Sequence, residues 1–286
     1  MTRRYLLVVR AGDFSLHPGW LDGPRSWDLH ISYFGSRDEP FGALPEGVSL
    51  SRETGPKYPG LSACLAAHPE FLDRYSLIGF PDDDLACRAA DWNRAFAVLD
   101  EIGADLGQPA LDPRSFFSYD IFLRRKKFRY REVDFVELMC PIFSMSFLRE
   151  ILPTWTLNAS SWGLDYLWRA RALREGRRMA IVDEASVLHT RAIGRGAQYS
   201  AANMKGGSRY DDFETVLKAH DITDRSRRVL RGVGKDGAST VNAFFLNRTL
   251  ILPGLRRKFR NVLNVEDVAP RRSLSGNGPV GVAPPW

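Results

Sequence analysis

Short apolar runs alternate with polar stretches rich in glycine and proline along the first two-thirds of the chain. Runs of about four to eight apolar or alternating residues predict strands, and apolar residues spaced three or four apart predict helices. The predicted strands cover 5–9, 27–34, 75–80, 135–143 and 179–189, and the predicted helices cover 61–67, 91–102, 146–152 and 162–175. Strands alternating with helices up to about residue 195 are typical of an α/β domain with a mainly parallel sheet.

Other segments depart from this pattern. Residues 36–59 are rich in glycine, proline and charge and predict a long loop, and the two prolines of 108–113 predict a turn. Residues 194–207 are glycine-rich and polar, and 211–265 have helical spacing and many basic residues. The domains expected are a catalytic domain over 1–195, a mobile loop and basic helical extension over 196–265, and a disordered tail over 266–286.

The composition is that of a globular protein with a basic balance. The chain has 286 residues, of which 44% are hydrophobic and 26% charged, and its formal net charge is +6. This length suffices for a sizeable core. A basic surface favours anionic partners such as phosphorylated substrates, nucleic acid or an anionic membrane face. The three widely spaced cysteines match neither a disulfide framework nor a zinc site, and they fit a reducing compartment.

The first apolar run is too short for a signal peptide. It ends after five residues, at Arg10, whereas a signal peptide needs about 7–15 apolar residues. Elsewhere the sequence has no run near the ~20 apolar residues of a transmembrane helix. We therefore expect a cytoplasmic protein.

Two basic segments, 124–131 and 255–263, suggest a contact with an anionic partner. The partner would be a phosphorylated or lipid-linked acceptor, or the inner face of a membrane to which the protein binds peripherally. The alternatives are a solvated loop for the first segment and a helix packed on its own domain for the second. Nucleic acid is not expected, because no known nucleic-acid-binding module is present.

Three consecutive aspartates, Asp82, Asp83 and Asp84, directly follow the predicted strand 75–80. Ligands of open α/β sheets bind at the carboxyl ends of strands. Adjacent carboxylates repel one another unless a cation relieves the repulsion, and Mg²⁺ and Mn²⁺ prefer oxygen ligands. The run therefore predicts a divalent metal site. A solvated acidic turn, or a cap for the next helix, is the alternative.

This strand end resembles the aspartate-x-aspartate motif of GT-A-type glycosyltransferases. More closely, the chain resembles the DUF707 family, an uncharacterised group thought to be GT-A-like. The matching segments follow the family's order and are PDDDL at 81–85, QPALDP at 108–113, VELMCPIFS at 136–144, WGLD at 162–165 and VDEASVLH at 182–189. The resemblance covers roughly residues 5–195. It implies a GT-A-like α/β fold with a mainly parallel sheet flanked by helices. The helical C-terminal extension is expected from the spacing of residues 211–265 alone.

The resemblance also implies roles for two residues outside the acidic run. His189, at the end of a predicted strand, would complete a Mn²⁺ or Mg²⁺ site. The alternative for His189 is a strand-end histidine bonded to a nearby carbonyl. Asp165 would be the catalytic base that activates the acceptor in an inverting transfer. Its alternative is a first-turn aspartate that complements the helix dipole and pairs with Arg169.

Further residues are candidates for binding the acceptor. Trp162 and Gly163 suit a sugar platform with close backbone approach, although Trp162 suits a core position equally well. Glu137 stands in an otherwise apolar run, and a buried carboxylate needs a partner or a function. Its alternative is a solvent-facing position on the polar side of the strand. Asp112, in the proline-rich turn, is a similar candidate.

Donor-binding candidates come from position and charge. Arg10 and Asp13 follow the first strand, where such folds place the nucleotide. Asp13 would bind the base or ribose, and Arg10 or Lys57 would meet the diphosphate. Lys205, in the glycine-rich segment, would close over the diphosphate as part of a lid. Solvated loop charges are the alternative for Arg10, Asp13 and Lys57.

Together these observations predict a metal-dependent glycosyltransferase that moves a sugar from a nucleotide-sugar donor to a saccharide or glycolipid acceptor. Two alternatives stay open. One is a non-catalytic nucleotide- or sugar-binding protein with the same fold, because fold does not imply function. The other is a metal-dependent phosphoryl-transfer enzyme or hydrolase, which shares the acidic cluster but usually needs carboxylates for a second metal.

Overall fold

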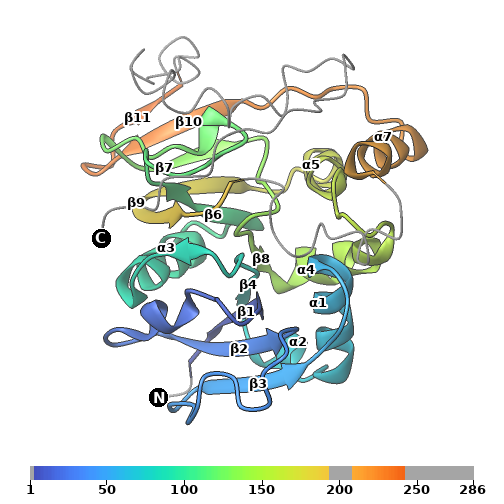
Figure 1. Ribbon diagram of the computed structural model, residues 1–286. Helices are drawn as coiled ribbons and strands as arrows, with labels where there is room; N and C mark the ends of the chain where they lie inside the picture. Colours follow the sequence, from blue (N-terminus) through green and yellow to red (C-terminus); the bar gives the residue numbers. More distant parts are fainter. Residues whose placement is uncertain (1–2, 193–207, 242–286) are drawn as a thin grey trace.

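The computed structural model describes residues 3–192 and 208–241, coloured in Figure 1. Lys205, the helix expected over 242–263, the basic segment 255–263 and the tail expected over 266–286 lie outside these residues. The strands are β1 (Tyr5–Ala11), β2 (Trp27–Tyr33), β3 (Val48–Arg52), β4 (Leu77–Gly79), β5 (Leu85–Ala86), β6 (Leu106–Leu111), β7 (Phe128–Val133), β8 (Ile142–Ser144), β9 (Met179–His189), β10 (Val229–Gly234) and β11 (Ser239–Thr240). The helices are α1 (Lys57–Ala67), α2 (Phe71–Arg74), α3 (Ala89–Glu101), α4 (Met145–Ile151), α5 (Leu164–Arg174) and α7 (Arg209–Ala219), with 3-10 turns at His17–Leu21, Asp120–Phe122 and Leu152–Thr156.

One large sheet organises the molecule, in the order β11-β10-β7-β9-β6-β8-β4-β1-β2-β3. The pairings place β1, β2, β3, β4, β6, β9 and β10 in one direction and β7, β8 and β11 in the other. The sheet is therefore mainly parallel, as expected. Its β4-β1-β2-β3 part is wholly parallel, and antiparallel strands enter beyond β4.

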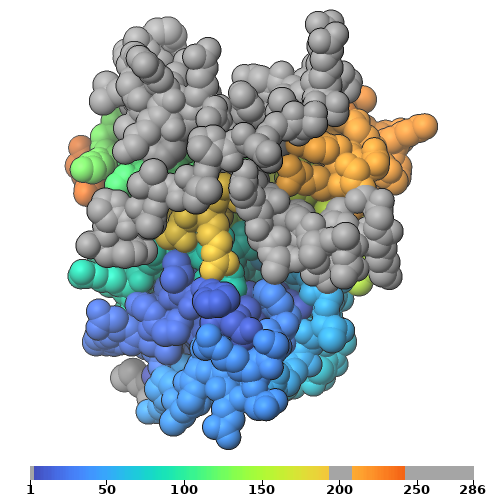
Figure 2. Space-filling model, viewed as in Figure 1, coloured from blue at the N-terminus to red at the C-terminus, as the bar shows by residue number. Residues whose placement is uncertain are grey.

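The parallel part has the apolar character of strands covered on both faces. Leu7, Val8 and Val9 of β1 are fully buried. Helix α1 packs on β1 and β2, and α3 packs on β6 and β9 (Figure 1). Figure 2 shows the N-terminal segments, in blue, in the lower part of one face and the region of α7, in orange, at its upper right.

A short antiparallel pairing sets the geometry at the carboxyl edge of the sheet. Strand β5 pairs with the end of β9, so that Leu85 lies opposite His189. The acidic run ends one residue before Leu85, and His189 is the last residue of β9. Consequently residues more than a hundred positions apart in the sequence meet at this edge.

Glycine is required where α5 begins. Gly163, which precedes the first residue of α5, has a φ of 91°, a conformation that residues with a side chain rarely adopt. A Cβ at Gly163 would also lie 3.0 Å from the Cβ of Val216 in α7. Helices α5 and α7 thus pack closely at this point, and the conformation and packing together account for the glycine.

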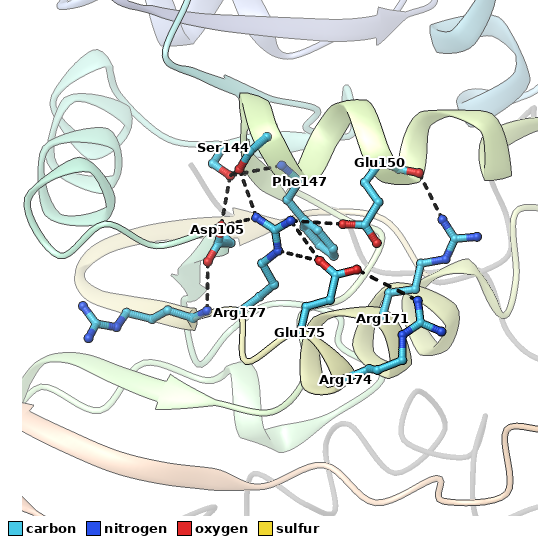
Figure 3. A network of polar contacts seen from close by, with 10 residues as sticks. Asp105, Ser144, Phe147, Glu150, Arg171, Arg174, Glu175 and Arg177 are labelled. Carbon is cyan, nitrogen blue, oxygen red and sulfur yellow. Dashed lines mark hydrogen bonds and ion pairs between the residues drawn. The ribbon is translucent and has the colours of Figure 1, made fainter.

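The other end of α5 is held by a network of charged side chains (Figure 3). Arg177, just after the helix, forms ion pairs with Asp105 at 3.1 Å, Glu150 at 3.2 Å and Glu175 at 2.9 Å. Asp105 precedes β6 and Glu150 belongs to α4. These contacts join α4, the end of α5 and the start of β6.

Several sequence predictions of elements were wrong. The long loop expected over 36–59 contains β3 and the start of α1, and the turn expected over 108–113 is largely β6. In the expected strand 135–143, only the end belongs to a strand, β8. After α7, the region expected to be helical continues with β10 and β11. Among the described residues, no helix is both long and apolar enough to cross a membrane.

Candidate metal and active site

Three potential metal ligands meet at the carboxyl edge of the sheet. Asp82 and Asp84 follow β4, and His189 ends β9. One ligand atom from each residue lies within 4.8 Å of the other two. Asp84 and His189 are buried and Asp82 is half-buried. The fold therefore brings together three of the four residues expected to bind the metal.

The ring of His189 is oriented by the backbone. Its Nδ1 lies 2.8 Å from the carbonyl oxygen of Phe116, and its Nε2 lies 3.4 Å from Oδ2 of Asp84. A carbonyl only accepts hydrogen bonds, so Nδ1 carries the proton of the neutral ring and Nε2 faces the carboxylates. This is the arrangement in which a histidine ligates a metal through one nitrogen while a second partner fixes the other.

Charge is balanced between Asp84 and His189. Burial disfavours the charged form of His189, but the Asp84 carboxylate outweighs this effect and raises the pKa of His189 to about 9. Burial likewise opposes charge on Asp84, yet His189 holds the pKa of Asp84 below its usual value. In the absence of a cation, a protonated His189 supplies the positive charge next to Asp84.

An unsatisfied oxygen shows that this balance is incomplete. Oδ1 of Asp84 is buried and has no hydrogen-bond partner within residues 3–192 and 208–241. Leaving a buried charged acceptor unpaired is costly. The carboxylates of Asp82 and Asp84 and the Nε2 of His189 together form a ligand set that suits a divalent cation such as Mn²⁺ or Mg²⁺.

Lys57 lies in this cluster and contacts Asp82. Its Nζ lies 2.7 Å from Oδ1 of Asp82 and donates to the carbonyl oxygens of Leu138 and Met139, at 2.6 and 3.0 Å. Burial raises the pKa of Asp82, and the Lys57 charge acts against that rise. Lys57, expected to contact the donor diphosphate, is therefore buried next to a metal-ligand candidate. The solvated-loop alternative for Lys57 is wrong.

Asp83 occupies a different position from its two neighbours. Its Oδ2 accepts a hydrogen bond from the backbone N–H of Gly12 at 2.9 Å, and its Oδ1 pairs with Arg191 at 3.2 Å. Burial raises the pKa of Asp83 to about 6. The structure does not place Asp83 with the other metal-ligand candidates. Instead its side chain joins the loop after β1 to the segment after β9.

Glu137 is a buried acid beside the cluster. Its backbone N–H donates to Oε1 of Gln108 at 3.1 Å, while its own Oε1 is buried without a partner in the described part of the chain. Burial raises the pKa of Glu137 to about 8, which His189 opposes and the Asp165 and Asp82 charges reinforce. The alternative of a solvent-facing Glu137 is therefore wrong.

Asp165 is buried in the first turn of α5. Burial raises the pKa of both Glu137 and Tyr58, and the charge of Asp165 adds to both shifts. Arg169 was the alternative ion-pair partner expected for Asp165. Its guanidinium binds Asp134 at 2.8 Å and Asp224 at 3.0 Å.

Trp162 lies between α5 and α7 in a half-buried position. Its ring packs edge-on to Tyr210, with centroids 5.6 Å apart, and the guanidinium of Arg209 lies 4.9 Å from its centroid. Tyr210 itself is half-exposed. Trp162 is thus part of an aromatic surface patch rather than of the core. Gly163, expected at a close acceptor contact, packs against Val216 of α7.

Arg10 is committed to the structure around β2 and β3. It donates to Oγ of Ser32 at 2.9 Å and to the carbonyl oxygens of Glu53 and Gly55 at 3.1 and 2.6 Å. Its side chain is 3% exposed. Both Nη atoms of Arg10 donate to acceptors within the protein, so the buried side chain does not reach a diphosphate. The alternative of a solvated loop charge is wrong as well.

Asp13 and Asp112 also have local partners. Asp13 accepts hydrogen bonds from the hydroxyl of Tyr33 and from Oγ of Ser36, the latter at 3.0 Å. These bonds lower the pKa of Asp13. Asp112 accepts from the backbone N–H and Nε of Arg114 at 2.9 and 2.8 Å. Asp112 therefore closes a turn after β6. Neither Asp13 nor Asp112 belongs to the group formed by Asp82, Asp84 and His189.

The basic segment 124–131 is only in part a solvated loop, because β7 begins at Phe128. Arg131 is fully buried and forms an ion pair with Asp183 at 2.7 Å. Arg129 pairs with Glu101 on the surface. The expectation that this whole segment meets an anionic partner is therefore wrong for Arg131, whose charge is buried against Asp183.

Comparison with solved structures identifies the architecture. A crystal structure of GalNAc-T7 with UDP, GalNAc and Mn²⁺ superposes with a TM-score of 0.55 at 10% identity, covering 76% of this chain and 48% of that chain. The fold is that of the GT-A glycosyltransferases. The chain thus spans about half the length of GalNAc-T7. The GT-A-like fold expected from the sequence is confirmed.

Two structures of Staphylococcus aureus TarS also match. One has a TM-score of 0.43 at 11% identity over 64% of this chain and 36% of that chain, and the other, of TarS 1–349, has 0.42 at 13% over 64% and 59%. No family model and no curated protein matches the sequence.

Sequence reasoning missed several residues that build the site. Phe116 orients His189 through its carbonyl, Gln108 accepts from the backbone of Glu137, and Arg191 pairs with Asp83. Tyr58, fully buried, donates to the carbonyl of Leu138 at 2.9 Å. Of these, only Gln108 lay in a segment that the resemblance had singled out.

Proposed function

We propose that this chain is a metal-dependent glycosyltransferase that moves a sugar from a nucleotide-sugar donor to a saccharide or glycolipid acceptor. The observation that carries the proposal is the meeting of Asp82, Asp84 and His189 at the carboxyl edge of a GT-A-type sheet, with a buried Asp84 oxygen that has no partner among the described residues. The cocrystallisation of GalNAc-T7 with UDP and Mn²⁺ supports it. The resemblance to the DUF707 family and a cytoplasmic location remain part of the proposal.

Asp82, Asp84 and His189 would hold the Mn²⁺ or Mg²⁺ ion. When bound, such an ion supplies Lewis-acid stabilisation of the diphosphate leaving group. The protein's own contribution is orientation. The carbonyl of Phe116 fixes the ring of His189, and Lys57 holds the carboxylate of Asp82. Asp83 stays outside the ligand set and anchors the loop after β1.

The acceptor side of the site would be built from Asp165, Glu137 and Trp162. In an inverting transfer, Asp165 takes the proton of the acceptor hydroxyl as that oxygen attacks the sugar carbon. Glu137, whose buried Oε1 has no partner in the described part of the chain, hydrogen-bonds the acceptor. The aromatic patch of Trp162 and Tyr210 offers a face on which an acceptor sugar packs.

A nucleotide panel tests the proposal. Purified full-length protein is mixed with nucleoside diphosphates and nucleotide-sugars, with Mn²⁺ or with EDTA, and thermal stability is recorded. We expect one nucleotide to raise the stability only when Mn²⁺ is present, because ligands of the native state stabilise it by mass action. Asp84→Asn should abolish that shift. Asp73→Asn is the matched control, because Asp73 is an exposed aspartate in a surface pair with Arg149.

Analysis of the reaction products separates the alternatives. A transferase, or its slow hydrolysis of the donor, releases the nucleoside diphosphate from the nucleotide-sugar. A phosphoryl-transfer enzyme or hydrolase cleaves within the diphosphate and releases the nucleoside monophosphate. Stable binding without either product would identify a binding protein. A folded protein that responds to no nucleotide would contradict the proposal.

A further inference from the structure

A second group of potential metal ligands lies under helix α1. His30 belongs to β2, Glu53 follows β3, and His68 is the residue after α1. One ligand atom of each lies within 4.8 Å of the other two. His30 is buried, and Glu53 and His68 are half-buried. These three residues have no part in the site proposed for sugar transfer.

The register of the sheet explains why this group is polar. Strands β2 and β3 pair in parallel with His30 opposite Ser49. Side chains two residues apart along a strand share a face, so Ser49 and Ser51 share one face of β3, and Ser32 shares a face of β2 with His30. Glu53 continues the same alternation just beyond β3. A row of polar side chains therefore faces the end of α1, where apolar residues are the norm.

Each of the three ligand candidates has a polar partner outside the group. Nδ1 of His30 lies 2.8 Å from Oγ of Ser49, and Nδ1 of His68 lies 3.3 Å from Oε1 of Glu70. Oε2 of Glu53 accepts from Oγ of Ser32 and lies 3.9 Å from Nη1 of Arg10. A histidine held at one nitrogen by a carboxylate or hydroxyl is the usual outer arrangement of a metal site.

One hydroxyl group lies between two of the three ligand candidates. Oγ of Ser51 lies 2.8 Å from Nε2 of His30, and it donates a hydrogen bond to Oε1 of Glu53. The rings of His30 and His68 lie 4.7 Å apart between centroids. A Ser51 hydroxyl between an imidazole nitrogen and a carboxylate oxygen occupies the place where an ion joining these ligands would lie.

We propose that His30, Glu53 and His68 form a second metal site, which binds Zn²⁺ and fastens the end of α1 to β2 and β3. Two imidazoles and one carboxylate are a ligand set that Zn²⁺ accepts, with water as the fourth ligand and the Ser51 hydroxyl displaced by the ion. This site is separate from the first, because α1 lies between them. Lys57 begins α1 at the first site, His68 follows its last residue, and 11 residues of helix span about 16 Å.

Zn²⁺ titration of the full-length protein tests this second site. The protein carries Asp84→Asn to weaken the first site and is stripped with a chelator, then loaded with Zn²⁺ and desalted. Bound Zn²⁺ is counted by elemental analysis, and thermal stability is followed in parallel. We expect one Zn²⁺ per chain and a rise in stability, and Co²⁺ in its place should give the visible absorption of a tetrahedral site.

Variants assign the bound ion to its ligands. His68→Gln should lose the Zn²⁺, whereas His220→Gln, which changes an exposed histidine after α7, should retain it. Glu70→Gln, which removes the outer partner of His68, should weaken Zn²⁺ binding by about 10–100-fold without abolishing it. Should His68→Gln fail to fold by circular dichroism, Glu53→Gln takes its place.

Two results would overturn the inference. One is a folded Asp84→Asn protein that retains no Zn²⁺ after desalting. The other is Zn²⁺ retained equally by the His68→Gln and His220→Gln variants. Neither depends on nucleotide binding or on sugar transfer, so failure of this inference leaves the proposed function untouched, and the reverse holds as well.

Discussion

Two buried clusters of charge in this protein differ in how completely their groups are paired. In the interior of the sheet, Asp183 binds Nε and Nη2 of Arg131 at 2.7 and 3.0 Å and accepts from the backbone of Arg125 at 2.7 Å. At the carboxyl edge, Oδ1 of Asp84 remains without a partner within the described residues. The interior pair is fully buried and the edge cluster less completely so, yet within the described residues it is the edge cluster that keeps a buried oxygen without a partner.

This difference separates a structural role from a functional one. Arg131 completes its own bonding with the carbonyls of Ile121 and Leu123, so it offers nothing to a ligand. The Asp84 cluster keeps a buried oxygen that a cation would satisfy. Buried polar groups are normally paired, and exceptions concentrate at functional sites. Substitutions in the interior cluster should therefore change stability, and substitutions at the edge should change ligand binding and activity.

The largest effect is expected in the interior cluster. Asp183→Asn leaves the charge of Arg131 buried without its partner, and we expect a loss of about 3–5 kcal/mol in the free energy of unfolding. Denaturant unfolding measures it. The double variant Arg131→Met/Asp183→Leu should recover at least half of the loss, because both charges are then removed. A loss below about 1 kcal/mol in the single variant would show that the pair is not essential to the fold.

At the edge, Asp84→Asn should mainly affect turnover. We expect the rate with the nucleotide-sugar identified by the panel to fall on the order of 10²–10³-fold, or roughly 3–4 kcal/mol, because the metal loses a ligand. Stability of the EDTA-treated protein at pH 8 should fall by less than about 2 kcal/mol, since His189 then loses only its charge partner. Steady-state kinetics and denaturant unfolding measure the two effects. A stability loss as large as that of Asp183→Asn would erase the distinction between the clusters.

A third comparison is given by His17, a buried histidine with no acidic partner in residues 3–192 and 208–241. Burial lowers the pKa of His17 to about 4, whereas Asp84 raises that of His189. Because the pKa of His17 is lowered in the folded protein, its full contribution to the free energy of unfolding is present above pH 6.5. That contribution is lost as the pH falls from 6.5 towards 4.

At pH 5 the loss from His17 should be about 2 kcal/mol. Comparing unfolding at pH 7 and pH 5 in the wild type and in His17→Gln measures it, with the exposed His220→Gln as control. The same loss between these pH values in His17→Gln as in the wild type would contradict this assignment.

The smallest effect is expected two residues from Arg131. Arg129 pairs with Glu101, whose side chain is 57% exposed. Solvent-exposed ion pairs contribute about 0–1 kcal/mol. We therefore expect Arg129→Ala to lose less than about 1 kcal/mol in denaturant unfolding. A loss comparable to that of Asp183→Asn would mean that position along β7, rather than burial of the charge, decides the effect.

The sequence predicted the elements whose apolar residues follow a clear period. Strands β1, β2 and β9 and helices α3 and α5 were predicted near their observed positions. Strand β6 was missed because Pro109, which has no N–H for a ladder, reads as a turn, and the pairing with β9 shifts register at this proline. The run 135–143 is apolar because most of it is buried, and burial alone does not distinguish a strand from a buried loop.

The sequence predicted the metal-ligand candidates of the site but not the residues that hold them in position. Asp82, Asp84 and His189 were suggested by their places at strand ends and by a family resemblance. The contacts of Lys57 with Asp82 and of Phe116 with His189 arise from tertiary approach, which no local pattern encodes. Arg131 was read as part of a surface run because its partner Asp183 lies 52 residues further on.

Direct measurement of Mn²⁺ binding tests the central claim most simply. The chelator-treated wild type and Asp84→Asn are titrated with Mn²⁺, and free Mn²⁺ is followed by electron paramagnetic resonance while circular dichroism confirms that both are folded. We expect the wild type to bind one Mn²⁺ at the carboxyl edge and Asp84→Asn to bind it at least about 10-fold more weakly. Equal binding by both proteins, or none by the wild type, would contradict the assignment of Asp82, Asp84 and His189 as a metal site.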